Sequence, residues 1–402
     1  MRPTILLLLA CLSLPGNGAP AQQTTTNATA AVSSRVDRAR WLGAPDRIAD
    51  GVDLFRVDGL ETTGPDAPQS VRLLRLDPVR VRLSSALATA DIPGRARVLD
   101  IARRHGAVAA VNAGFFSPPG EPVGLLRVDG RLVSDTRRHR GAVAILDDGR
   151  GVRLRFGQAS ARVRLRFRVG GAWRSVQIDG VDTVRSPGRL VLFTPASGAT
   201  TGTNSGREWT IESATRRDGT RVLRASLPSS RGDTTIPADG YVLSRSGPAA
   251  SASLAALPRA TDVRIEETID VLGGSRQADW QRASTVIGGA GLLMRDGRRL
   301  TAWAREQLSK GFETTRHPRT VVGRDRNGAI WLIAVDGRQP GRAVGMTFLE
   351  LQDLLGRLDV TDALNLDGGG STTMVVEGEV VNRPSDLTGP RAVSDALIVT
   401  AR

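Results

Sequence analysis

The sequence is poor in the residues that bind soft metals or form covalent cross-links. Its 402 residues include one cysteine, Cys11, and three histidines. A single cysteine cannot form an internal disulfide, and so few thiol and imidazole groups do not support a Cys/His zinc site. We therefore expect that no cofactor is required, with Ca²⁺ on oxygen ligands as the metal left open.

Aromatic residues and lysine are also scarce. Aromatic side chains make up 4% of the chain and Lys310 is its only lysine, although the net charge is +14. The positive charge is almost all arginine and is spread along the chain, unlike the clustered, aromatic-rich pattern of a nucleic-acid-binding protein. The arginines fit an acidic cell envelope or a phosphate-bearing substrate better. A bias in genomic base composition is the alternative explanation.

No apolar run is long enough to form a transmembrane helix. Residues 5–14 are apolar, follow a short basic start and precede an Ala-Pro-Ala sequence at 19–21, which has the form of a signal-peptidase site. Residues 1–21 are therefore predicted to be a signal peptide, and the protein to be exported to the periplasm or secreted. The sequence Leu-Leu-Ala-Cys that ends at Cys11 resembles a lipoprotein box, so acylation of Cys11 is an alternative.

The rest of the chain is predicted to form a linker and one large domain. Residues 22–45 are rich in Thr, Ala and Ser without apolar periodicity, which indicates a flexible linker. Residues 46–402 can bury a sizeable core and divide into an N-terminal part (46–150), a β-rich middle part (151–283) and a C-terminal part (284–402). Alternating apolar segments outnumber helical ones, so the predicted fold class is mixed α+β, with β-rich sheets and a few packed helices.

Two helices are expected in this domain. Residues 95–105 have one apolar side, and Thr347 begins a second helix with a capping box to Glu350 and a leucine stripe. Each helix leads to a short apolar strand that ends in an asparagine, Asn112 or Asn365, close to glycine. Sites in α/β arrangements gather at such strand ends.

The glycine-rich stretch 362–376 is the most unusual part of the sequence. A short apolar strand ends at Leu366, and after Asp367 and three consecutive glycines the chain enters a second apolar strand at Met374. Consecutive free N–H groups in such a turn can form a nest for an oxyanion, with Asp367 at its rim. A tight hairpin with local turn hydrogen bonds is the alternative, and this stretch alone leaves both open.

Five segments, taken in order, resemble the phosphodiester glycosidase family. They are Val-Asn-Ala-Gly-Phe-Phe at 111–116, Arg-Thr-Val-Val-Gly at 319–323, Asp-Gly-Arg at 336–338, Asn-Leu-Asp-Gly-Gly-Gly-Ser-Thr-Thr at 365–373, and the segment 382–391. The similarity is densest over 285–400 and 70–145. The resemblance implies a hydrolase, a glycosidase that acts on glycosyl phosphodiesters, whose catalytic domain would be 46–402.

The implied reaction places particular demands on a site. An ordinary glycosidase uses one carboxyl group to protonate a poor leaving group and a second as nucleophile or base. A phosphate monoester is already a weak base and can leave without protonation. The site therefore needs few catalytic carboxylates and several arginine or backbone N–H donors.

On this basis Asp367 is the leading candidate for the carboxylate that activates water or stabilises an oxocarbenium-like state, and Asp336 is the next. The candidates for binding the substrate are Asn112, Arg316, Arg319, Asn365, Gly368, Gly369, Gly370, Ser371 and Arg391. The arginines, glycines and serine would hold the phosphate, and the asparagines would contact sugar hydroxyls or orient the carboxylate. Each has a simpler alternative as a turn residue, a solvated side chain or a strand cap, and no metal ligand is assigned.

Two other functions remain open. One is a non-catalytic envelope protein that binds phosphorylated glycans through the same arginines. The other is a metal-dependent phosphoesterase that cuts the phosphorus–oxygen bond. The expected partner is in each case a sugar phosphodiester or a phosphorylated glycan and not a nucleic acid.

Overall fold

The computed structural model describes residues 41–61, 67–136, 138–247, 252–272 and 276–402. The predicted signal peptide and most of the predicted linker lie outside these residues. From Leu42 onward the described residues belong to one unit, which is rich in strands and has few helices, as predicted. None of the described helices is long and apolar enough to cross a membrane.

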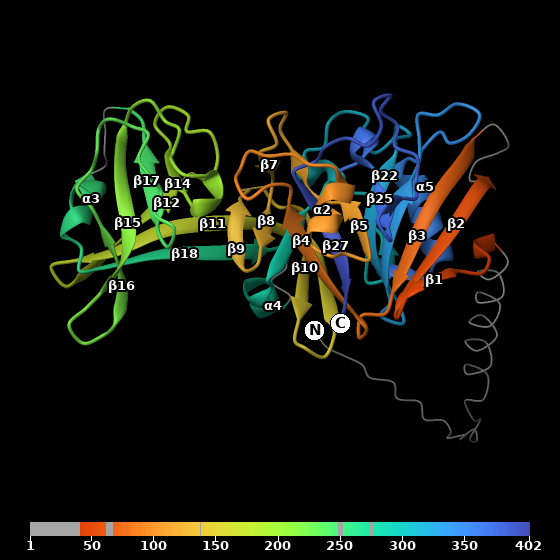
Figure 1. The fold of residues 1–402 in the computed structure, drawn as a ribbon, viewed down its shortest axis with the longest axis horizontal. Coiled ribbons are helices and arrows are strands. Elements are labelled where there is room, and N and C mark those ends of the chain that lie inside the picture. Colours follow the sequence, from red (N-terminus) through yellow and green to blue (C-terminus); the bar gives the residue numbers. More distant parts are fainter. Residues whose placement is uncertain (1–40, 62–66, 137, 248–251, 273–275) are drawn as a thin grey trace, which may run out of the picture. The chain divides into compact units, whose positions relative to one another are not determined.

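An eight-stranded antiparallel sheet joins the N-terminal and C-terminal parts of the predicted domain. Its strands, in spatial order, are β1 (Asp46–Ala49), β2 (Val52–Glu61), β3 (Pro68–Leu76), β23 (Ile330–Val335), β22 (Arg319–Asp325), β24 (Val360–Asn365), β20 (Leu292–Arg295) and β21 (Arg298–Arg299). Strand β3 pairs with β23, with Leu74 opposite Leu332, so the sheet links segments far apart in the sequence (Figure 1).

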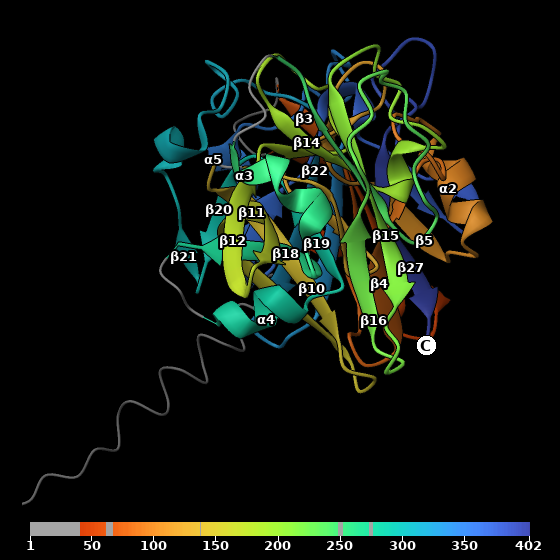
Figure 2. The ribbon, with the colours of Figure 1, turned by 90° about the vertical axis from the view of Figure 1, so that its left-hand side faces the viewer.

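A five-stranded antiparallel sheet carries the first predicted helix. Its spatial order is β26 (Glu379–Val380), β25 (Met374–Val376), β5 (Ala109–Asn112), β27 (Asp395–Ala401) and β4 (Val81–Leu87). Helix α2 (Val98–Arg104) lies beside β5 and β27 (Figure 2) and packs on them through buried Val98, Ile101 and Ala102. The helix lies within the predicted range 95–105.

A twelve-stranded sheet holds the middle of the chain. Its spatial order is β13 (Gly180–Val181), β14 (Leu190–Phe193), β17 (Tyr241–Arg245), β15 (Arg207–Thr215), β16 (Arg221–Ala225), β18 (Asp262–Val271), β11 (Val152–Val169), β10 (Arg140–Asp147), β19 (Thr285–Gly288), β8 (Leu126–Val128) and β9 (Arg131–Ser134), with β12 (Ala172–Ile178) on β11. Along β11, buried Val163, Leu165 and Phe167 alternate with arginines, so one face of this strand enters the core and the other faces outward.

Short elements complete the described fold. They are the β6 (Phe115–Phe116) and β7 (Pro122–Val123) pair, α3 (Ala252–Ala255), α4 (Gln277–Arg282), and the 3₁₀ turns η1 (Pro195–Ser197), η2 (Leu257–Arg259), η3 (Trp303–Glu306) and η4 (Gly369–Ser371). Helix α5 (Phe348–Arg357) has the predicted capping box, in which Thr347 Oγ1 accepts from Glu350 N at 3.2 Å and Glu350 Oε2 accepts from Thr347 N at 2.8 Å. Its buried leucine face packs on β20 and β24, so α5 supports the strand that enters the glycine-rich stretch.

One apolar core is shared by the eight-, five- and twelve-stranded sheets. It includes Leu74 and Leu364 from the eight-stranded sheet, Val111 and Leu397 from the five-stranded sheet, and Ile145 from the twelve-stranded sheet. Complete burial of one such side chain stabilises the fold by about 1.5–3 kcal/mol. A second core lies within the twelve-stranded sheet. The shared core holds the two smaller sheets together and thereby fixes their strand ends.

The glycine-rich stretch crosses from one sheet to another. Strand β24, before the glycines, belongs to the eight-stranded sheet, and β25, after them, belongs to the five-stranded sheet. Because these strands do not pair with each other, the tight-hairpin alternative is wrong.

Candidate active site

Strand ends from two sheets meet around the glycine-rich stretch. Because β22 runs antiparallel to β23 and β24, its first residues lie beside the last residues of those strands. In the five-stranded sheet the end of β5 lies beside the starts of β25 and β27 for the same reason. We name the residues gathered here the loop site: Asn112, His317, Arg338, Asp367, Asp395 and the turn Gly368–Ser371.

Asn112 fastens the two groups of strand ends to each other. Its Nδ2 donates to the backbone oxygen of Asp367 at 2.7 Å. Its Oδ1 accepts from Thr320 Oγ1 at 2.7 Å and from the Thr373 N–H at 3.2 Å. The side chain is fully buried, so these bonds are protected from water. Of its two predicted roles, this geometry fits orienting the segment that carries Asp367.

Asn365 is the last residue of β24, and its side-chain amide is hydrogen-bonded to backbone oxygens. Its Nδ2 donates to the backbone oxygens of Ala290 and Leu366, both at 2.9 Å. It is fully buried, and within the described residues its Oδ1 has no hydrogen-bond partner. The side chain therefore holds β24 against the segment that precedes β20.

Asp367 is the partly exposed carboxylate of the loop site. Its Oδ1 accepts from the Gly368 N–H at 2.9 Å, and its own N–H donates to Ala113 O at 3.0 Å. Burial raises the pKa of Asp367 to about 6, the neighbouring charge of Asp395 adds to the rise, and the Ser371 hydroxyl and Arg391 oppose it. A carboxyl group with this pKa can accept or release a proton near neutral pH.

Asp395 is a second carboxylate of the loop site that the sequence analysis did not select. It is the first residue of β27 and is fully buried, and burial raises its pKa. Its oxygens accept from the Gly114 N–H at 3.1 and 3.2 Å and from Ser394 Oγ at 2.8 Å. A Cβ atom on Gly114 would lie 3.1 Å from Asp395 Oδ1, so the absence of a side chain at Gly114 lets its N–H approach the carboxylate without crowding. The signal in the sequence was Asp395 at the start of an apolar run just after the 382–391 segment.

The carboxylate of Asp336 is hydrogen-bonded to other groups of the protein. Its carboxylate accepts from Asn382 Nδ2 at 2.9 Å, from the Arg383 N–H at 3.0 Å and from Ser70 Oγ at 3.3 Å. It is 1% exposed, and burial raises its pKa. Asn382 also donates to the backbone oxygen of Thr372 at 3.1 Å. Asp336 therefore holds the glycine-rich stretch in place through Asn382.

Two of the predicted phosphate-binding arginines hold carboxylates of the protein. Arg316 Nη2 lies 2.6 Å from Oε1 of Glu350, the capping residue of α5. Arg391 Nε lies 2.8 Å from Asp386 Oδ2. This second pair lies close over Gly370: a Cβ atom there would lie 2.1 Å from Arg391 Nη2, so a larger residue would require the pair to shift.

The third predicted arginine, Arg319, is buried between two aromatic rings. Its guanidinium carbon lies 4.9 Å from the Phe312 ring centroid and 4.8 Å from that of Phe348. Its Nε donates to Met346 O at 2.9 Å and its Nη2 to Phe312 O at 2.7 Å and Thr315 O at 2.9 Å. Burial lowers its pKa to about 10. These contacts tie the 312–315 segment to β22.

The amides of the glycine turn are largely used within the protein. The Gly368 N–H donates to Asp367, the Gly369 N–H to Pro318 O at 2.9 Å and the Ser371 N–H to Gly368 O at 3.1 Å. The turn is therefore closed by its own hydrogen bonds. The predicted row of free N–H donors for an oxyanion is reduced accordingly.

Arg338 and His317 also belong to the loop site and were not selected from the sequence. Arg338 follows the Asp-Gly pair at the end of β23, and its Nη2 lies 3.3 Å from His317 Nδ1. A Cβ atom on Gly369 would lie 3.1 Å from the same Nη2, so the guanidinium sits against the glycine turn. The sequence signal was the Asp-Gly-Arg motif at 336–338.

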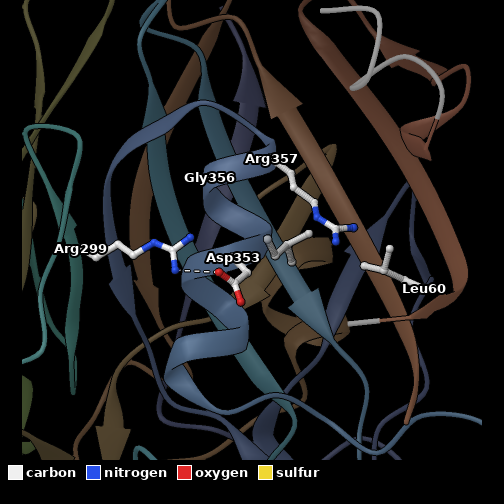
Figure 3. A pocket seen from close by; sticks show the side chains of 6 residues that line it. Leu60, Arg299, Asp353, Gly356 and Arg357 are labelled. Carbon is white, nitrogen blue, oxygen red and sulfur yellow. Dashed lines mark ion pairs between the residues drawn. The ribbon is translucent and has the colours of Figure 1, made fainter. Parts of the chain in front are cut away.

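A prominent cavity lies elsewhere. A cavity of about 410 Å³ lies beside α5, and Arg299 Nη1 lies 2.6 Å from Asp353 Oδ1 in its lining. Figure 3 shows the side chains that line it. None of the loop-site residues lines it. Within the described residues, no group of three or more His, Cys, Asp or Glu side chains is arranged to hold a metal ion.

The comparison with protein families matches part of the chain to one family model. Residues 211–400 match the family model described as phosphodiester glycosidase. The chain carries a phosphodiester glycosidase domain. The matched range includes every residue of the loop site except Asn112.

Curated relatives match the phosphodiester glycosidase domain over a short stretch. The chain is 46% identical over 68 residues to N-acetylglucosamine-1-phosphodiester alpha-N-acetylglucosaminidase of Bos taurus, which is 17% of this chain and 12% of that protein. It is 38% identical over 85 residues to a prophage-derived uncharacterized protein of Bacillus subtilis, 21% of this chain and 13% of that protein. The matched stretch thus spans about an eighth of the relatives' own length.

Solved structures share the fold over most of the phosphodiester glycosidase chain. A hypothetical protein from Synechocystis superposes with a TM-score of 0.70 at 25% identity, over 88% of this chain and 63% of that one. A putative exported protein from Burkholderia pseudomallei superposes with a TM-score of 0.64 at 24% identity, over 95% of this chain and 82% of that one.

Proposed function

We propose that this protein is an exported hydrolase that cleaves the sugar–phosphate bond of a glycosyl phosphodiester, with residues 46–402 as its catalytic domain. The family match supports a glycosidase that acts on phosphodiesters. The observation that carries the proposal is Asp367: a partly exposed carboxylate whose pKa burial raises to about 6, at the crossover between two sheets. Residues near such crossovers are held by two sheets and can position a substrate without large motions.

In the proposed reaction, water adds to the anomeric carbon of the sugar and the bond from that carbon to the phosphate oxygen breaks. The ionised carboxylate of Asp367 takes a proton from the attacking water, or stabilises positive charge on the sugar ring as the bond lengthens. The phosphate monoester departs with its electron pair. Because this leaving group is a weak base, the reaction needs no second carboxyl group to protonate it.

The other carboxylates have positioning roles in this proposal. Asp336 and Asp395 are fully engaged by donors of the protein and are buried, whereas Asp367 is accessible. Burial is the main cause of the raised pKa of Asp367, and the charge of Asp395 makes a smaller contribution in the same direction. Asn112 holds the backbone of Asp367 in place.

Hydrolysis of a glycosyl methyl phosphodiester in ¹⁸O-labelled water tests the proposal. We expect release of the sugar together with methyl phosphate that carries no label, because the sugar–oxygen bond breaks. The methyl phosphate is the informative product, since the free sugar exchanges its anomeric oxygen with water. Label in the phosphate, with loss of turnover on addition of a chelator, would instead indicate a metal-dependent phosphoesterase. Binding of the diester without any turnover would indicate a glycan-binding protein.

A further inference from the structure

An arginine and a histidine form a cationic cluster against the glycine turn. Arg338 Nη2 lies 3.3 Å from His317 Nδ1 and close to Gly369. Arg338 is exposed and His317 is partly exposed, so a solute can reach both. Within the described residues no carboxylate lies within ion-pair distance of Arg338, and its positive charge is not neutralised by the protein.

The backbone of Arg338 is held in a conformation that arginine disfavours. Its φ is 59°, in the left-handed region, which costs a residue with a Cβ atom about 1–2 kcal/mol. The residue before it is closely packed: a Cβ atom on Gly337 would lie 2.8 Å from Pro318 N and from Gly345 Cα. A glycine would suit the Arg338 position better. A strained residue that is kept in place indicates a task for its side chain.

His317 is surrounded by positive charge. Burial lowers its pKa, and the guanidinium groups of Arg319 and Arg338 lower it further. The Phe312 ring lies 6.4 Å from the His317 ring, and Glu313 is near enough to act on the charge of Arg319. His317 is therefore held largely neutral, and an anion that enters would favour its protonated form.

The remaining arginines of the region cannot serve as well. Arg316 and Arg391 each bind a carboxylate of the protein, and Arg319 is buried and donates to three backbone oxygens. Arg338 is the guanidinium here whose donors face solvent with a histidine beside them. A guanidinium matches the paired oxygens of a phosphate, and a neighbouring imidazole can add a further donor.

We propose that Arg338 and His317 form the subsite that binds the phosphate group of the substrate. The identity of the ligand as a phosphodiester rests on the proposed function, whereas the anion site itself rests on the geometry alone. The diester carries one negative charge and the departing monoester carries up to two. The positively charged subsite therefore binds the transition state, in which negative charge grows on the departing phosphate, more strongly than the intact substrate, and this difference accelerates the reaction.

Nuclear magnetic resonance of the histidine side chains tests the subsite without catalysis, since the chain has three histidines and His317→Gln assigns the signal. With inorganic phosphate as the probe, we expect the pKa of His317 to rise by about one unit at saturation. Arg338→Gly should weaken phosphate binding at least about tenfold. Because glycine suits the backbone there, this variant should keep the thermal stability of the parent.

The matched control is Arg276→Gly. Arg276 also has a left-handed backbone, with a φ of 56°, but lies at the start of α4 outside the loop site. This variant should bind phosphate as the parent does. A His317 signal that ignores phosphate, or equal phosphate affinity for Arg338→Gly and Arg276→Gly, would overturn the proposal.

Turnover separates this inference from the proposed function. If His317 responds to phosphate but the protein releases no sugar from a phosphodiester, the anion site stands and the proposed function fails. If Arg338→Gly hydrolyses the phosphodiester with the kcat/KM of the parent, the function stands and the subsite is wrong.

Discussion

Two arginine-rich regions of the molecule use their charge in opposite ways. On the outer face of β11 and β18, Arg162 pairs with Asp270 at 2.6 Å and Arg166 with Glu266 at 2.9 Å. In the loop site, Arg338 has no such partner among the described residues. The net charge of +14 therefore says little about function. What distinguishes the loop site is that its positive charge is left for a ligand.

The carboxylates of the two regions also differ in their surroundings. Asp270 and Glu266 lie on a solvated surface beside arginines, whereas burial raises the pKa of the loop-site residues Asp367 and Asp395. A carboxyl group whose pKa is raised by folding makes the folded state less stable at every pH at which the group is ionised. The loop site thus contains destabilising charge that the outer sheet face avoids, which is typical of functional sites.

Replacing one carboxylate in each region should give the largest contrast. We expect Asp367→Asn to lower kcat on a glycosyl phosphodiester by about 10³-fold, within the range for loss of a general acid or base. Asp270→Asn, which removes a surface partner of Arg162, should leave kcat unchanged. Steady-state kinetics with both variants measures this. Equal activity of Asp367→Asn and the parent would remove Asp367 from the mechanism.

Removing one amide side chain from each region should give the next largest effect. Asn112→Ala breaks three hydrogen bonds in a fully buried position and should reduce the free energy of unfolding by about 2–4 kcal/mol. Gln177→Ala breaks two bonds, to Val163 O and Ile178 O, in an exposed position, so we expect a loss below about 1 kcal/mol. Urea unfolding of both variants decides the comparison. Similar losses would mean that Asn112 does not hold the strand ends together.

The pH dependence of stability should reveal the cost of Asp367. Its folded pKa of about 6 lies above the unfolded value of about 3.9. The free energy of unfolding of the parent therefore falls by about 2–3 kcal/mol as the pH rises from about 4 to about 6. Below pH 4 the group is protonated in both states and this loss is absent. Asp367→Asn cannot ionise, so its stability relative to the parent should increase over this interval. A difference between the two proteins that stays constant from pH 4 to pH 7 would contradict the raised pKa.

Local sequence signals predicted the elements that depend on near neighbours. The capping box at Thr347 and Glu350 and the apolar stripe that follows are separated by a few positions, and α5 forms there as expected. The apolar alternation typical of strands is likewise a local pattern, and in β11 it continues along one strand. Asp367 was found because glycine runs between apolar strands are visible in the sequence alone.

Pairing between distant residues could not be predicted in the same way. Arg316 meets Glu350 34 positions later, and Gly114 meets Asp395 281 positions later. The sequence therefore did not reveal that Arg316 already holds a carboxylate while Arg338 does not. Which arginine remains available depends on how the two smaller sheets pack, and this information is not local.

The smallest effect is expected for an ion pair of the outer sheet face. A double-mutant cycle on Arg166 and Glu266 should give a coupling below about 1 kcal/mol, because both side chains are more than a third exposed, at 36% and 39%. Salt should reduce it further. Arg166 also lies 5.0 Å from the Trp173 ring centroid, so Arg166→Ala alone should cost more than the coupling with Glu266. A coupling of several kcal/mol would mean that charge pairing on this face stabilises the fold strongly, and the contrast with the loop site would then lie in geometry and not in energy.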